Sequence, residues 1–179
     1  TQFFFEDDLV EWSFQCARKY FPQNELIINE ATEQAWDVHA AGRSAYSAVI
    51  ADSIRKGAVI DGIGLQYHLF YSKEREAEQA CPLLSPKRLY GCMDHYWNRY
   101  HKPLQVTEVT IPAYSNSAED EALQAEVLEK LFTIWFSHPA MEAAIYWNLV
   151  DGYAAFAPQR DMTAGENYYH GGLIRFDMT

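Results

Sequence analysis

The sequence predicts an α/β fold in which four helices alternate with four parallel strands. Two observations predict it. Three of the four predicted helices place apolar residues three and four positions apart, as on one face of a helix, and each of the four is followed by a short apolar run of strand type. The runs recur about every 40 residues, a spacing that suits βα units with functional loops. At 179 residues, the chain is long enough for one well-packed domain, residues 1–179.

In the first half of the chain, two helices and two strands are expected. Helical spacing begins at Asp8 and stops before Pro22, and residues 26–29 follow as a short apolar strand with a polar end. A second helix is expected over about residues 41–56, with a glycine directly after it. The next strand covers residues 59–68, and it also ends in polar residues.

The second half repeats this order. Ser85 and the proline after it are an N-cap and a first-turn proline, and the helix they begin leads into a strand at residues 104–111. Ser117 has an acidic residue three positions later, which resembles a capping box at the start of the fourth helix. The last strand is expected at residues 143–148.

Two architectures fit this order of elements. A small doubly wound sheet commonly carries a glycine-rich phosphate loop after its first strand, and no such loop is present. The other architecture is half of an eight-stranded barrel, in which catalytic groups come from the C-terminal ends of several strands. Here every predicted strand ends in polar or aromatic groups, which favours the barrel.

Composition and charge exclude some partners. The formal net charge of −11 would repel phosphate backbones and anionic membranes, so neither nucleic acid nor a membrane is an expected partner. Aromatic residues make up 15% of the chain, and some are expected to line a surface or cleft. Cys16, Cys81 and Cys92 lack metal-ligand spacing, and they fit either one Cys81–Cys92 disulfide or three buried thiols. No metal and no cofactor are expected.

Glu108 is the first candidate for chemistry, because it is the one charge in an otherwise apolar or amide-bearing strand. Pairing with an arginine at the strand end is the alternative. The groups expected beside it are an acid, a histidine, amides and aromatic rings. Amides and histidine bind sugar hydroxyls, aromatic rings stack on pyranose faces, and carboxylates react at the anomeric centre. The residues at these strand ends are Asn29, Glu30, Gln66, His68, Glu108, Trp147 and Asn148.

Three segments, residues 60–68, 106–111 and 145–152, resemble in the same order those of glycoside hydrolase family 10, the endo-β-1,4-xylanases. The resemblance spans nearly the whole chain and implies a TIM (β/α)8 barrel, of which this chain covers roughly strands 5 to 8, the C-terminal half of the catalytic domain. It also implies hydrolysis of xylan with retention. Glu108 would be the nucleophile and His68 would orient it. The residues it implies for substrate binding are Asn29, Gln66, Trp147, Asn148 and Phe156.

Two positions depart from the family pattern. The family usually has an Asp two residues after its nucleophile, where this chain has Thr110, so carboxylate support of His68 is lost or replaced. A tryptophan of the family corresponds to Phe156, which keeps a stacking face but has no indole donor.

A retaining glycosidase also needs a second carboxyl as acid and base, and the family carries it on its fourth strand. Glu30 is a weaker alternative, so that carboxyl is expected upstream of this chain, and the missing N-terminal half of the barrel is an expected partner. The expected substrate is xylan or xylo-oligosaccharides, and a polymeric substrate implies a secreted protein, extracellular or periplasmic. The alternatives are a related β-glycanase of another specificity and a non-catalytic xylan-binding fragment.

Overall fold

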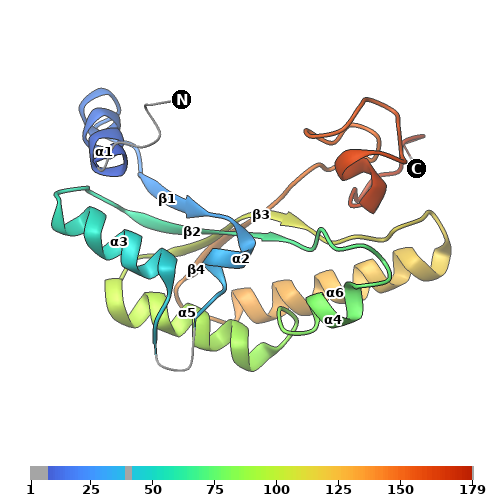
Figure 1. Cartoon of the computed structure of the whole chain (residues 1–179), viewed down its shortest axis with the longest axis horizontal. Coiled ribbons are helices and arrows are strands. Elements are labelled where there is room, and N and C mark those ends of the chain that lie inside the picture. Colours follow the sequence, from blue (N-terminus) through green and yellow to red (C-terminus); the bar gives the residue numbers. More distant parts are fainter. Residues whose placement is uncertain (1–7, 39–41, 179) are drawn as a thin grey trace.

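The computed structural model describes residues 8–38 and 42–178, and it contains one parallel sheet of four strands in the order β1-β2-β3-β4. Consecutive strands are neighbours throughout, without the reversal of strand order that defines a doubly wound sheet. The arrangement is therefore that of a barrel sector (Figure 1). The strands are β1 (Ile27–Glu30), β2 (Gly62–His68), β3 (Leu104–Thr110) and β4 (Met141–Tyr146).

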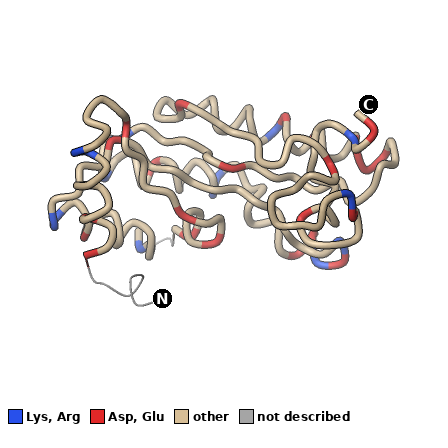
Figure 2. Tube along the Cα trace, turned by 90° about the horizontal axis from the view of Figure 1, so that it is seen from above, with Lys and Arg blue, Asp and Glu red and all other residues tan. Residues whose placement is uncertain are grey.

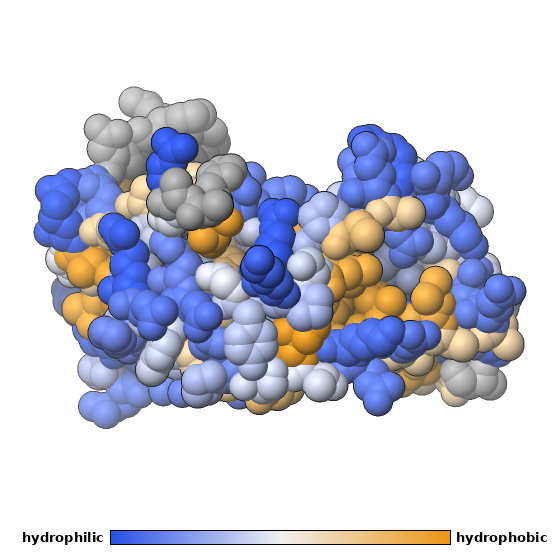
Figure 3. All heavy atoms as spheres, turned by 90° about the horizontal axis from the view of Figure 1, so that it is seen from below, coloured by the Kyte–Doolittle hydropathy of each residue, from blue (hydrophilic) through white to orange (hydrophobic). Residues whose placement is uncertain are grey.

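The helices between the strands lie mainly along one face of the sheet, where α3, α5 and α6 run side by side (Figure 1). On the opposite side, which we call the open face, α1 and the 3-10 helix η2 lie above the two ends of the sheet, and α3, α5 and α6 do not cover it (Figure 1). Seen from the helical side, the surface is mostly hydrophilic with apolar areas in its middle and right-hand parts (Figure 3). The helices are α1 (Leu9–Tyr20), α2 (Thr32–Ala35), α3 (Ala45–Arg55), α4 (Glu76–Ala80), α5 (Pro86–Tyr100), α6 (Ala118–Phe136) and the 3-10 helix η2 (Gly165–Tyr169).

The core lies between the sheet and the helices. Alternate side chains of β2 and β3, including Leu65, Tyr67 and Val106, are fully buried there. Tyr67 packs edge-on against both Trp36 and Trp135, with ring centroids 5.5 and 5.0 Å away. The intervening strand residues face the open side and are mostly polar or glycine, so this side of the sheet carries polar groups rather than a second apolar core.

The predicted order of helices and strands is confirmed, but several boundaries differ, and the three largest differences are as follows. The second helix begins at Ala45, because the Ser44 side chain accepts the Ser47 amide as its N-cap; residues 39–41 lie outside the described residues. The strand predicted at 59–68 begins at Gly62. The last strand is 141–146 rather than 143–148. The short helices α2, α4 and η2 were not predicted, because four or five residues are too few to show a periodicity.

The N-caps read from the sequence are confirmed at Ser85 and Ser117, whose side chains accept the amides of Arg88 and Asp120. The capping box at Ser117 is only half formed. The carboxylate of Asp120 turns to Ser115 and Lys73 instead of reaching back to the Ser117 amide. It therefore ties the start of α6 to the loop after β2.

Cysteine state, membrane-spanning helices and metal-binding clusters can be read from the described residues. All three cysteines are free, but only Cys92 is buried and Cys81 is exposed, so neither the Cys81–Cys92 disulfide nor the set of three buried thiols is realised. None of the described helices is long and apolar enough to cross a membrane. Among those same residues, no group of three or more His, Cys, Asp or Glu side chains could hold a metal ion.

A tyrosine on α3 joins the first two strands, and its removal is expected to destabilise the fold. The buried Tyr46 hydroxyl contacts the carbonyl oxygens of Ile28 and Gly64 at 2.8 and 3.0 Å. Tyr46→Phe deprives both buried carbonyls of this donor and should lower the free energy of unfolding by about 1–3 kcal/mol. Urea unfolding of the two proteins measures this change in free energy. Tyr20→Phe, at an exposed site, is the matched control; equal stability of the two variants would contradict the assignment.

Candidate active site

A cleft of about 460 Å³ lies at the C-terminal ends of the strands, on the open face of the sheet. It brings together side chains from β2, β3, α2 and the segment after β4. The lining residues are Ala31, Thr32, Glu33, Gln66, His68, Phe70, Glu108, Trp147, Phe156 and Glu166. Five of the residues singled out in the sequence, Gln66, His68, Glu108, Trp147 and Phe156, are among them.

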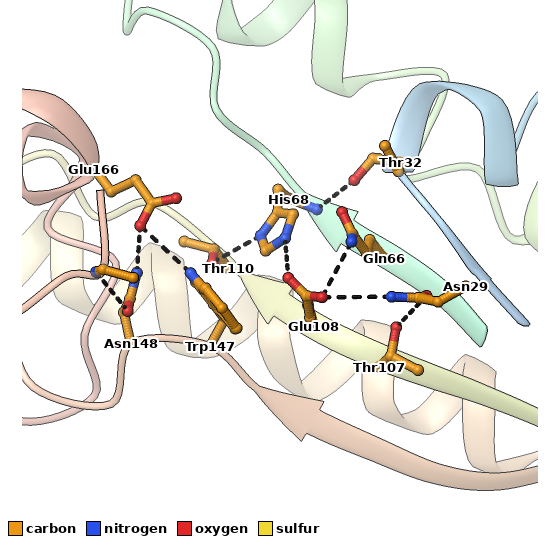
Figure 4. Close-up of polar contacts among 12 residues, drawn as sticks. Asn29, Thr32, Gln66, His68, Thr107, Glu108, Thr110, Trp147, Asn148 and Glu166 are labelled. Atoms are coloured by element: carbon orange, nitrogen blue, oxygen red, sulfur yellow. Dashed lines mark hydrogen bonds and ion pairs between the residues drawn. The ribbon is translucent and has the colours of Figure 1, made fainter. Parts of the chain in front are cut away.

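Glu108 is held by three side-chain N–H groups, two from the neighbouring strand β2 and one from β1 beyond it (Figure 4). Its Oε1 accepts from Gln66 Nε2 at 3.0 Å and from Asn29 Nδ2 at 3.4 Å. Its Oε2 lies 3.2 Å from His68 Nε2. The predicted alternative of an arginine partner is not realised among the described residues. These contacts fix the carboxylate at the floor of the cleft, with 22% of its side chain exposed.

An irregularity in β3 places Glu108 beside Gln66. Leu65 pairs with Val106, but Gln66 pairs with Glu108, so Thr107 is an extra residue in the ladder. Such bulges re-aim side chains and occur often beside active sites. Without it, strict alternation would direct Thr107 and Glu108 to opposite faces, whereas here both are partly exposed and make contacts on the open face.

Asn29 reaches Glu108 across β2 because the intervening residue is a glycine. A Cβ at Gly64 would lie 2.8 Å from Asn29 Oδ1 and from Thr107 Cγ2. Asn29 Oδ1 accepts from Thr107 Oγ1 at 2.6 Å, which orients its amide so that Nδ2 points to Glu108. Asn29 is therefore a support for the carboxylate, and it does not itself line the cleft.

His68 links Glu108 to Thr110. Its Nε2 faces Glu108, and its Nδ1 lies 3.0 Å from Thr110 Oγ1. Burial lowers the pKa of His68, and the hydrogen bond to Glu108 only partly offsets this, so the neutral imidazole is favoured. A neutral ring has one N–H, which must be on Nε2 because a carboxylate only accepts. Nδ1 therefore accepts from the threonine hydroxyl, and Thr110 replaces the carboxylate that was expected there.

The far side of the cleft is aromatic. Trp147 lies edge-on to His68 at 6.2 Å, and Phe70 stacks on His68 at 4.7 Å. Phe156 lies farther out, with 74% of the residue exposed, where a ligand could cover it. Trp147 continues from β4 through its backbone N–H, which donates to Val109. The cleft thus combines a fixed carboxylate with exposed rings.

Two further candidates from the sequence, Asn148 and Glu30, do not line the cleft. Asn148 has a φ of 58°, which ends β4, and its amide bonds to Glu166 and to the Ala155 N–H; it supports the loop and does not line the cleft. Glu30 follows Asn29, so it points to the other side of β1, and its carboxylate accepts the Ala31 N–H. Glu30 is not part of the cleft that contains Glu108.

Glu166 was missed by the sequence analysis. It lies in η2, within an irregular segment that has no apolar periodicity, and it lines the cleft. Its Oε2 accepts from Asn148 Nδ2 at 2.6 Å and faces the indole N–H of Trp147 and the amide of Phe156, both at 3.4 Å. No pattern in the sequence singles it out.

Comparison with known proteins decides the family. The sequence model of glycosyl hydrolase family 10 matches residues 3–165. The chain belongs to glycosyl hydrolase family 10. It is 24% identical over 148 residues to endo-1,4-beta-xylanase B of Cellvibrio japonicus, covering 83% of this chain and 21% of that protein. It is 37% identical over 62 residues to endo-1,4-beta-xylanase B of Neocallimastix patriciarum, covering 35% and 7%.

Solved structures show the same fold. Xylanase 10B from Thermotoga petrophila, determined with xylobiose, superposes with a TM-score of 0.65 at 20% identity over 97% of this chain and 48% of that one. A β-glucuronidase from Ruminococcus gnavus superposes with a TM-score of 0.62 at 17% identity, over 96% and 27%. The family-10 chain thus forms half of a (β/α)8 barrel, as predicted, and it spans about half the length of the family-10 structure it matches.

Proposed function

We propose that this family-10 chain carries the nucleophile of a retaining endo-1,4-β-xylanase, and that the nucleophile is Glu108. The observation that supports it most strongly is the set of three N–H groups, from Asn29, Gln66 and His68, which aim one carboxylate into the cleft. The family membership and the xylanases among the relatives support the substrate class. The xylobiose bound to the Thermotoga petrophila xylanase supports xylo-oligosaccharides as ligands.

In the proposed reaction, Trp147 and Phe156 stack on xylose rings and hold the chain across the cleft. Glu108 attacks the anomeric carbon as the bond to the leaving oxygen breaks, through an oxocarbenium-like transition state, and forms a covalent glycosyl ester. Water then cleaves the ester, and the two inversions give net retention. His68 and Gln66 keep the carboxylate in line for attack through their hydrogen bonds.

The reaction also needs a carboxyl about 5 Å from Glu108, which protonates the leaving oxygen and then activates water. Glu30 points away from the cleft and does not fit this role. We place the acid/base in the half of the barrel that this chain does not include. That half of the barrel would also cover the open face of the sheet. Because xylan is too large to enter a cell, we further propose that the protein is secreted.

The test is a substrate panel with two forms of the protein. The complete protein that carries this chain should hydrolyse xylan, with at least about tenfold lower kcat/KM on mixed-linkage β-glucan and β-mannan. The 179-residue chain alone should release no reducing sugar from xylan. If the complete protein hydrolysed glucan or mannan faster than xylan, that polysaccharide would be its substrate instead of xylan. Binding of xylo-oligosaccharide without turnover by the complete protein would instead favour a non-catalytic function.

A further inference from the structure

The cleft is acidic on the side that this chain provides. Three of its lining residues are glutamates, namely Glu33, Glu108 and Glu166. The lining contains no lysine and no arginine. The one basic side chain of the lining, His68, has a lowered pKa and is neutral near pH 7. The tube coloured by charge shows acidic positions in the middle of the open face, with lysine and arginine mostly toward the ends (Figure 2). A negatively charged ligand would meet only like charge here.

Glu166 is the carboxylate nearest the aromatic rings, and the local backbone fixes its place. Gly165 before it has a φ of +55°, and a Cβ there would lie 2.2 Å from the Phe156 carbonyl oxygen, so only glycine fits this turn. The turn holds Glu166 against Trp147 and Phe156, the two rings that are proposed to stack on sugar.

The two oxygens of Glu166 have different surroundings. Every hydrogen bond recorded for the side chain among the described residues goes to Oε2. Oε1 has no partner in that part of the chain, and it points to the side on which His68 lies (Figure 4). A carboxylate oxygen turned into a cleft accepts hydrogen bonds from sugar hydroxyls and repels a second carboxylate. One oxygen therefore supports the loop, and the other is free for ligand.

We propose that Glu166 determines specificity at this site, accepting neutral sugar units beside Trp147 and Phe156 and rejecting units that carry a uronate. The inference rests on the proposed function for its substrate class, but its physical basis is the charge of one oxygen. Like charges brought together at a binding site cost enough to change relative rates by at least about tenfold. A neutral hydroxyl in the same place has no such cost.

The experiment compares two oligosaccharides that differ in one group, which is a charged carboxylate in the first and a neutral hydroxymethyl in the second. One is a xylo-oligosaccharide with a glucuronic acid side group, and the other is the same compound after reduction of its carboxyl to an alcohol. The complete protein should prefer the reduced compound by at least about tenfold in kcat/KM, and about 0.5 M NaCl should narrow that ratio. In Glu166→Gln the ratio should fall close to one and lose its salt dependence. That variant keeps an oxygen to accept from Trp147 and Asn148.

Glu129→Gln is the control, because Glu129 is exposed on α6 and lies outside the cleft, so its ratio should match that of the parent protein. An unchanged ratio in Glu166→Gln overturns the proposal. A parallel loss on both compounds also overturns it, since Glu166 would then only support the loop. If the protein hydrolyses neither compound, the proposed function fails. The selection against charge is then tested by calorimetric titration, which gives the ratio of the affinities for the reduced and the charged compound in each variant.

Discussion

Glu108→Gln is expected to lower kcat/KM on xylan by about a thousandfold or more while leaving the protein folded. The amide cannot form the glycosyl ester, whereas it is close in shape to the carboxylate and keeps one oxygen, which can accept from Gln66 in the place of Oε1. Ground-state binding should change little, so the loss should appear in kcat more than in KM. Steady-state kinetics of the complete protein on xylo-oligosaccharides measures both terms.

The matched control for this variant is Glu129→Gln, which removes one carboxylate from an exposed position on α6. It should leave kcat and KM close to those of the parent protein. If Glu108→Gln retained more than about a tenth of the parent kcat, another group would be the nucleophile. If both variants lost activity alike, net charge rather than position would be responsible.

Thr110→Asp is expected to invert the protonation of His68. In the parent chain, burial holds the pKa of His68 below its usual value of 6.5, and Nδ1 accepts from the Thr110 hydroxyl. An aspartate accepts instead, so the imidazolium would bridge two carboxylates, and its pKa should rise above 6.5. A proton NMR titration of the His68 ring measures the midpoint. A midpoint that stays below 6.5 would contradict the expected bridge between His68 and the two carboxylates.

The sign of the pH effect on stability follows from the same shift. In the parent chain, the contribution of His68 is fully present above pH 6.5 and is lost as pH falls from there toward the lowered pKa. In Thr110→Asp, the contribution of His68 to stability is present below pH 6.5 and is lost as pH rises through the raised pKa.

Thr110→Val, which deletes only the hydroxyl, should reduce kcat by about tenfold through looser placement of His68. Thr133→Val, exposed on α6, is its control.

Much of the site could be predicted from sequence because parallel strands end at one edge of a sheet. That rule placed Asn29, Gln66, His68 and Glu108 together before any contact was known, and the structure joins all four by hydrogen bonds. The order of helices and strands followed from apolar spacing together with the cap, proline and glycine signals at the ends of the helices. The family resemblance added the barrel and the place of this chain within it.

The remainder depends on backbone geometry that residue type does not specify. The extra residue Thr107 in β3 breaks the alternation on which strand patterns rely, so its effect on Glu108 was not predictable. Asn148 looked like part of a strand, but its positive φ turns its amide into the loop. Glu166 acts from an irregular segment that only the folded chain brings beside Trp147.

The most direct test of Glu108 as the nucleophile is covalent trapping. The complete protein would be incubated with a 2-deoxy-2-fluoro xylobioside that carries a good leaving group, because the fluorine slows both steps and the leaving group restores only the first. Peptide mass spectrometry should then locate one added fluoroxylobiosyl group on the peptide that contains Glu108. Glu108→Gln should show no added mass. A label on any other carboxylate would contradict the account, and so would turnover with inversion and no adduct.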